Sequence, residues 1–315
     1  MSAAGPDEAD RGDALGRAGG AGGGTDAGAG DDRILTSTRG LSAFIAPFLL
    51  VAFVLLYGYP GDTARLWSWP IQAHMTSMLL ASAYLGGCYF FLRVVLLEQH
   101  WAAVRAGFVS VALFATLLGI ATILHWDKFT HTKVAFWLWA GLYFTAPFLV
   151  LAALLTNQRY AGQPAPDAPR LGQVPRLVVA GVGGLAVLTG LFLFLVPAQA
   201  ITVWPWPLTP LTARVVGATF CLGAAALAVL LDDRWEAVRL MRTVQLVMFG
   251  LILVAAVRAR HEFFTGRPLT WVMGVGFVGL FAASITSALR DPDRQRSRGR
   301  HEGPRAAPTG PAPTG

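Results

Sequence analysis

Charged side chains are scarce in this chain. Asp, Glu, Lys and Arg make up 14% of its 315 residues, whereas soluble domains usually carry about 25%. Lysine is almost absent, since it occurs only at Lys128 and Lys133. Most charges lie near the two ends of the chain or in short segments between long apolar blocks, and the mean hydropathy is +0.52. These features exclude a soluble globular domain and indicate an integral membrane protein.

The net charge of +7 rests almost entirely on arginine. A basic balance can point to nucleic acid, but here the arginines flank apolar blocks. Membrane topology and lipid head groups account for that placement. We therefore expect membrane lipids as partners and no nucleic acid. The excess of Arg over Lys, with abundant Ala, Gly and Val, is typical of bacteria with GC-rich genomes.

Cysteine is also rare, with only Cys88 and Cys221 in the chain. Both lie inside apolar blocks, which is typical of small buried thiols. No Cys-x-x-Cys pair or Cys/His spacing indicates zinc or an iron–sulfur cluster. The sequence therefore predicts no metal site and no cofactor.

The apolar blocks have the length of membrane spans. A helix needs about 20 apolar residues to cross about 30 Å of hydrocarbon. Only the seventh block is short of charge-free residues, because Arg242 and Arg258 flank it. The sequence predicts an all-α integral membrane bundle of about eight transmembrane helices. The predicted spans are residues 41–59, 70–92, 106–126, 134–156, 177–197, 211–231, 239–257 and 269–289.

The two ends of the chain lack any apolar period. Residues 1–38 and 291–315 cannot bury enough apolar surface to offset the entropy of ordering, so we predict disordered cytoplasmic tails there. Residues 159–176 form a predicted cytoplasmic linker. With both termini inside, the inner segments carry 18 basic residues and the outer segments carry 7. This asymmetry favours a multi-pass plasma-membrane protein with both termini in the cytoplasm.

An internal repeat divides the chain into two similar parts. At an offset of 137 residues, Trp67-Ser68-Trp69-Pro70 matches Trp204-Pro205-Trp206-Pro207, and at an offset of 134 residues Trp101 matches Trp235. Paired tryptophans and prolines in one order indicate a duplication. We therefore predict two tandem four-helix repeats, at 39–158 and 177–290. An even number of spans in each repeat gives both the same orientation, related by a pseudo-two-fold axis along the membrane normal.

The stretch from Trp204 to Arg214, which reads W-x-W-P followed by L-T-P-L-T-A-R, resembles uncharacterised multi-pass membrane proteins of bacteria, actinobacteria in particular. A weaker copy runs from Trp67 to Ser77 and lacks the arginine. The motif covers a small part of the chain, and the resemblance implies no known activity.

The tryptophans of this motif, at Trp67, Trp69, Trp204 and Trp206, precede spans on the predicted outer face. Tryptophan favours the membrane interface because its ring is apolar while its N–H seeks a partner. One interpretation is therefore an interfacial anchor beside a helix start. The other is an aromatic lid over a cavity between the repeats.

Arg214 lies just inside the sixth span, where a guanidinium must reach the interface or find a partner. Its candidate partners are Asp127 and Glu262, both in outer loops. His74 and His125 lie near the same face, and such histidines serve either as ordinary polar lining or as haem or metal ligands. We favour polar lining, because the second repeat has Leu211 where the first has His74.

A Gly-x-Gly-x-x-Gly stretch at Gly274, Gly276 and Gly279 lies inside an apolar span rather than after a strand, which excludes a dinucleotide site. Small residues there predict close helix packing instead.

Three classes of function remain open. The first is a transporter-like or ligand-binding membrane protein, whose small solute or lipid binds at the outer half of the repeat interface. Its predicted site comprises Arg214, Glu262, Asp127, His125, His74 and the four tryptophans. The second is a structural or regulatory membrane subunit that binds a protein partner, and the third is a membrane-embedded enzyme or haem protein.

Overall fold

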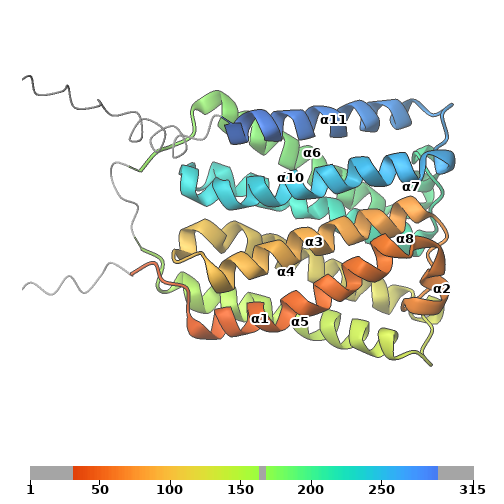
Figure 1. Cartoon of the computed structure of the whole chain (residues 1–315), viewed down its shortest axis with the longest axis horizontal. Helices are drawn as coiled ribbons and strands as arrows, with labels where there is room; N and C mark the ends of the chain where they lie inside the picture. Colours follow the sequence, from red (N-terminus) through yellow and green to blue (C-terminus); the bar gives the residue numbers. More distant parts are fainter. Residues whose placement is uncertain (1–30, 163–167, 290–315) are drawn as a thin grey trace, which may run out of the picture.

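The computed structural model describes residues 31–162 and 168–289. Residues 1–30 of the predicted N-terminal tail (1–38), residues 163–167 of the predicted linker and the whole predicted C-terminal tail (291–315) lie outside the described residues. The described chain is a bundle of long helices (Figure 1), and no β-strand occurs within it apart from two isolated bridges. Eight of its helices are long and apolar enough to cross a membrane, which confirms the predicted all-α membrane bundle. These spans are Thr36–Gly58, His74–Leu96, Trp101–Leu124, Val134–Gln158, Gln173–Leu195, Pro210–Leu230, Trp235–Arg258 and Pro268–Leu289.

Each span lies within a few residues of its predicted range. The first span consists of helix α1 (Thr36–Phe53) and a π-helical turn, η1 (Val54–Gly58). Helix α1 thus begins inside the segment predicted to be a tail. Just before it, the Trp101 N–H donates to the Asp32 carbonyl at 2.7 Å. The fold therefore includes the residues immediately before the helix.

The sixth span starts where its sequence provides a helix cap. The Thr209 hydroxyl accepts from the Thr212 N–H, and Pro210 occupies the first helical position, where its missing N–H costs nothing. Helix α8 (Pro210–Phe220) begins there rather than at Pro207. The span then continues through η4 (Cys221–Gly223), α9 (Ala224–Leu227) and η5 (Ala228–Leu230).

The remaining spans are single helices, namely α3 (His74–Leu96), α4 (Trp101–Leu124), α5 (Val134–Gln158), α6 (Gln173–Leu195), α10 (Trp235–Arg258) and α11 (Pro268–Leu289). We call residues 31–162 the first half and residues 168–289 the second half. In the first half α1 packs on α3 and α4 on α5; in the second half α6 packs on α8 and α10 on α11. Between the halves, α3 packs on α10 and α4 packs on α8.

The long helices run along the longest axis of the molecule (Figure 1). We call the end where α1 begins and α11 ends the terminal end, and the opposite end the distal end. Two short helices, α2 (Thr63–Leu66) and α7 (Pro197–Val203), lie at the distal end in the connections that lead to α3 and α8.

Glycines allow α6 and α8 to approach closely. A Cβ added at Gly190 would lie 2.5 Å from the Gly217 carbonyl oxygen, and one added at Gly217 would lie 2.6 Å from the Gly190 carbonyl oxygen. The prediction of close packing at Gly274, Gly276 and Gly279 is wrong, because a Cβ at any of them would meet no atom within 4 Å. These three glycines of α11 border open space instead.

Matching contacts occur in the two halves. Lys133 donates to the carbonyls of Ala64 and Trp67 in the first half. In the second half Arg267 donates to the carbonyls of Ile201 and Trp204. Each residue of the second set follows its counterpart by 134 or 137 residues. In each half, a basic side chain before the last span thus forms hydrogen bonds with the backbone at the start of the tryptophan motif and just before it.

Candidate functional site

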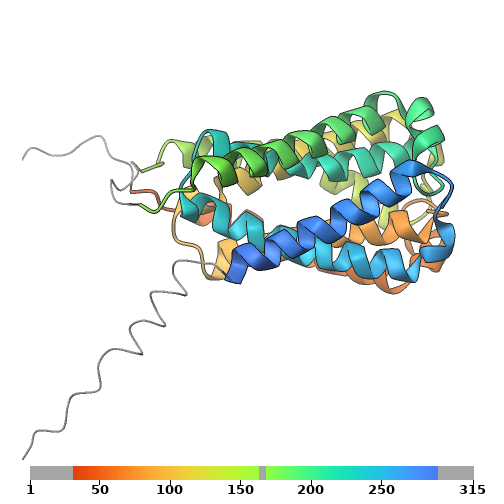
Figure 2. The same ribbon diagram turned by 90° about the horizontal axis from the view of Figure 1, so that it is seen from above.

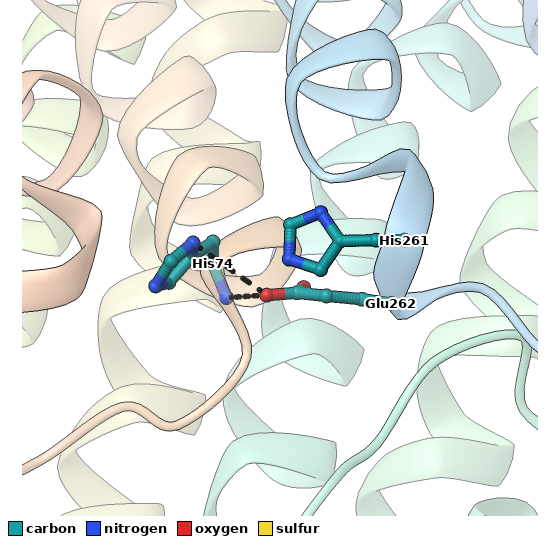
Figure 3. Close-up of side chains that lie close together, drawn as sticks. All are labelled: His74, His261 and Glu262. Carbon is teal, nitrogen blue, oxygen red and sulfur yellow. Dashed lines mark hydrogen bonds and ion pairs between the residues drawn. The ribbon is translucent and has the colours of Figure 1, made fainter.

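Glu262 joins the two halves at the distal end. Glu262 is the last residue of η6 (Arg260–Glu262), and its carboxylate points at the start of α3 in the other half (Figure 3). One carboxylate oxygen accepts from the His74 N–H at 2.8 Å and the other from the Met75 N–H at 2.9 Å. The first N–H groups of a helix have no partner within the helix and carry partial positive charge. Glu262 therefore caps α3 from across the interface.

Two imidazoles flank this carboxylate. His74 Nδ1 lies 3.7 Å from Glu262 Oε1, and the ring of His261 stands edge-on to that of His74 with centroids 6.2 Å apart. The donor atoms of His74, His261 and Glu262 all lie within 4.8 Å of one another. Figure 3 shows His74 coming from α3 and the other two from η6. The histidine and carboxylate types present here are common metal ligands.

Arg214 forms a second contact between the halves. Its Nη1 lies 2.6 Å from Nε2 of His125, the residue that directly follows α4. Because an arginine is always protonated, it donates this bond, which leaves the His125 proton on Nδ1. Burial and the positive charge of Arg214 lower the pKa of His125 below its usual value. His125 is therefore a neutral acceptor at neutral pH.

The partners predicted for Arg214 are wrong. Asp127 pairs instead with its neighbour Lys128 at 2.6 Å, and both side chains are exposed. The Glu262 carboxylate caps α3. In the described part of the chain the Arg214 Nε is buried without a hydrogen-bond partner. The structure thus separates the predicted polar site into two contacts, Glu262 with α3 and Arg214 with His125.

The four motif tryptophans are buried, with exposed fractions of 7% or less. Trp67 and Trp69 pack on Trp139 with ring centroids 5.7 and 4.8 Å apart, and Trp204 and Trp206 pack on each other at 5.1 Å. Such burial contradicts the interpretation of these side chains as interfacial anchors. Trp206 also crosses the interface between the halves, since its Nε1 donates to Thr76 Oγ1 at 2.9 Å.

A cavity of about 950 Å³ lies between the helices and is lined by residues of both halves. Among the nine residues of the predicted site, only Trp204 lines it. The described lining contains no Asp, Glu, Lys, Arg or His, and most of it is aliphatic or aromatic. Its polar side chains are Tyr84, Ser110, Tyr143, Thr189, Thr219 and Gln245.

The cavity is open on the side where α6 and α11 face the membrane. Four exposed side chains line it there. Leu185 and Leu188 of α6 are 68% and 66% exposed, and Val272 and Val275 of α11 are 65% and 73% exposed. Figure 2 shows α6 (green) and α11 (blue) slanting in the same direction and separated along their length. None of the residues of α11 is buried. The cavity therefore communicates with the surroundings through the gap between α6 and α11.

In the first half the corresponding helices, α1 and α5, are in contact. Asn157 of α5 accepts from the Leu35 N–H at 3.0 Å and donates to Thr38 Oγ1, which fastens α5 to the start of α1. Deeper in this half, the Tyr143 and Tyr84 hydroxyls form a hydrogen bond of 2.9 Å. At the offsets of the predicted repeat, Phe277 and Cys221 stand in the second half in place of the two tyrosines, so this hydrogen bond has no counterpart there.

A cavity between the repeats was one of the two interpretations of the tryptophan motif, but only Trp204 of that motif lines it, and the sequence did not indicate the apolar residues of α6 and α11. The glycines of α11 were the available signal, but small residues in a membrane span indicate either close packing or an open groove. Only the position of the neighbouring helix decides between the two.

Comparison of the chain with protein-family models, with curated proteins and with solved structures found no match.

Proposed function

We propose that this multi-pass membrane protein binds an apolar, lipid-like molecule in the cavity between its two halves, which the molecule enters between α6 and α11. The observation that carries this proposal is the cavity itself. Its volume of about 950 Å³ is at the upper end of the range typical of small-molecule sites, about 300–1,000 Å³.

The chemistry of the lining selects the ligand class. An ion or a charged solute in this cavity would lose its hydration without gaining a charged partner, which is costly. A hydrocarbon chain loses nothing there and gains packing contacts with the walls. Thr189 and Gln245 offer hydroxyl and amide groups that can orient one polar group of the ligand.

The side opening supports the same ligand class. The gap is bordered by exposed Leu and Val side chains of two membrane spans, so it faces the hydrocarbon region. A ligand that is already dissolved in the bilayer can reach the cavity without crossing water. Such access favours a lipid or another membrane-soluble molecule over an aqueous solute.

For orientation, we propose that the terminal end is cytoplasmic and that the protein lies in the plasma membrane. Arg39 and Arg176 lie at this end and donate to carbonyls at the ends of neighbouring spans, Val94 at 2.7 Å and Leu230 at 2.7 Å. Cations near helix C-termini are favourable, and excess arginine marks cytoplasmic loops. The distal end, with Glu262 and Arg214, then faces outward.

For origin, we propose that the two halves are a tandem duplication in parallel orientation. The paired contacts of Lys133 and Arg267 support it. The backbone supports it as well, because the residue after each first span has nearly the same conformation, with φ −126° and ψ 55° at Tyr59 and φ −125° and ψ 55° at Val196. The copies have since diverged, because the Tyr84–Tyr143 hydrogen bond of the first half has no counterpart at Cys221 and Phe277.

Labelling with a photoactivatable probe tests the function. Gly276 lines the cavity and Gly274 does not, although a Cβ would meet no atom within 4 Å at either position. We expect a diazirine analogue of palmitic acid to label residues of α6 and α11 in the wild-type protein. Gly276→Phe should lower this labelling severalfold by filling the opening, while Gly274→Phe, the matched control, should leave it unchanged. Equal labelling of all three proteins would contradict the proposal.

A second candidate is a subunit whose α11 packs against a partner protein. The complete lack of buried residues in α11 favours it. Native mass spectrometry of protein extracted in mild detergent separates the two candidates. A stoichiometric protein partner would favour the subunit, whereas a bound species of lipid mass would favour the apolar-ligand site.

A further inference from the structure

We infer that His74, His261 and Glu262 form a binding site for a divalent cation of the Zn²⁺ class at the distal end. This site is separate from the apolar cavity, which none of the three residues lines. It joins the two halves, because His74 begins α3 in the first half and the other two residues end η6 in the second half.

The ligand types fit this class of cation. Two imidazoles and one carboxylate suit Zn²⁺, whereas Mg²⁺ and Ca²⁺ prefer oxygen ligands alone. Zn²⁺ with three protein ligands completes its tetrahedron with water. Because His261 is exposed, solvent can reach the fourth position.

The distances require only a small adjustment. The three donor atoms lie within 4.8 Å of one another. Ligand atoms about 2.0–2.1 Å from a tetrahedral Zn²⁺ are about 3.4 Å apart, so the most distant pair must approach by up to roughly 1.4 Å. His74 Nδ1 and Glu262 Oε1 are already 3.7 Å apart. The remaining movement is that of His261, whose side chain is exposed.

The carboxylate is held ready for this role. Glu262 is 12% exposed, and each of its oxygens accepts a backbone N–H from α3. Each carboxylate oxygen has a second lone pair that remains for a metal. Hydrogen bonds of this kind fix the orientation of metal-binding carboxylates. The negative charge of Glu262 also offsets the partial positive charge of the α3 terminus, which would otherwise repel a cation.

Isothermal titration calorimetry of the full-length protein in detergent, with Zn²⁺ as the titrant, tests the site. We expect one Zn²⁺ to bind per chain at the distal end and to raise the melting temperature, because it binds the folded state and links the halves. His261→Ala should weaken this binding by about tenfold or more. Its side chain is exposed, so the variant should fold normally. Glu262→Gln retains an oxygen that can accept from α3 and should also weaken binding.

His131→Ala is the matched control, since His131 lies in a distal connection of the first half but outside the cluster. It should bind Zn²⁺ like the wild type. Wild-type protein in which Zn²⁺ gives no saturable one-to-one binding would overturn the inference. Unchanged affinity in His261→Ala would overturn it as well, because the binding would then come from other groups. With Co²⁺ in place of Zn²⁺, the wild type should show the visible absorption of a tetrahedral complex, and His261→Ala should lose it.

Discussion

Arg105 of the first half lies 3.3 Å from the Asp232 carboxylate of the second half. The reciprocal pair, Arg239 of the second half and Glu98 of the first half, is 3.9 Å apart. Asp232 is 9% exposed and also accepts from Arg234 at 2.6 Å. Burial alone would raise the pKa of Asp232, but the hydrogen bonds from Arg234 and the charges of both arginines outweigh it and lower the pKa. Ion pairs thus join the halves at the terminal end, as Glu262 does at the distal end.

The first prediction concerns this pair. Asp232→Asn removes a nearly buried charge, and Arg105 and Arg234 lose their ion pairs with it. The substitution should therefore lower the free energy of unfolding by about 1–3 kcal/mol. The measurement is thermal unfolding in detergent at neutral pH. Asp127→Asn is the control, because Asp127 and Lys128 form an exposed pair, and such pairs contribute little. Equal effects of the two substitutions would show that the Asp232 pair does not hold the halves together.

The second prediction concerns pH. The pKa of His125 is lowered by burial and by Arg214, so below about pH 6.5 the unfolded chain takes up a proton that the folded protein does not. Stability should therefore fall as the pH drops from about 7.5 to about 5.5. The variant His125→Gln should lack the share of this stability loss that comes from His125. Unfolding temperatures at both pH values measure it, and an identical pH dependence of the two proteins would refute the assignment.

The third prediction concerns the helix cap from across the interface. Glu262→Ala leaves two N–H groups of α3 without their acceptor and should cost about 1 kcal/mol, with about 2 kcal/mol as an upper value. Lys128→Ala is the matched control, since Lys128 stands at the corresponding place in the first half and α8 has its own cap in Thr209. Urea or thermal unfolding compares the variants. A loss as large for Lys128→Ala would contradict the capping role.

The fourth prediction concerns the contact of α6 with α8. Gly217→Val places a side chain against the Gly190 carbonyl and should destabilise the protein by about 1–3 kcal/mol. Gly181→Val, on the same pair of spans but with open space around it, should have a much smaller effect. Thermal unfolding of the two variants decides the matter, and comparable losses would mean that α6 and α8 are not in close contact there.

The spans were predictable because their signal is local. Lipid offers no hydrogen bonds to the backbone, so each long apolar block must form a helix. The charge-free stretch of α10 is short, but the arginines that flank it did not prevent a helix. Arg258 donates to the Tyr57 carbonyl at 2.8 Å, and Arg242 lies over the ring of Trp235 with its Cζ 4.5 Å from the centroid.

The side-chain environments were not predictable, because they depend on partners far apart in the sequence. Tryptophans beside a span are as apolar in a packed interior as at an interface, so Trp204 and Trp206 gave no sign of their burial. Arg214 binds a neutral histidine rather than a carboxylate, a choice set by how α4 and α8 pack. The open gap beside Gly276 likewise depends on where α6 lies.

The cavity and its side opening are the centre of this account. Electron cryomicroscopy of the protein in lipid nanodiscs tests them most directly. We expect elongated density between α6 and α11 that continues past Leu188 and Val272 into the interior. Side chains of α6 and α11 packed against each other, with no density between them and no space for a chain, would contradict the account.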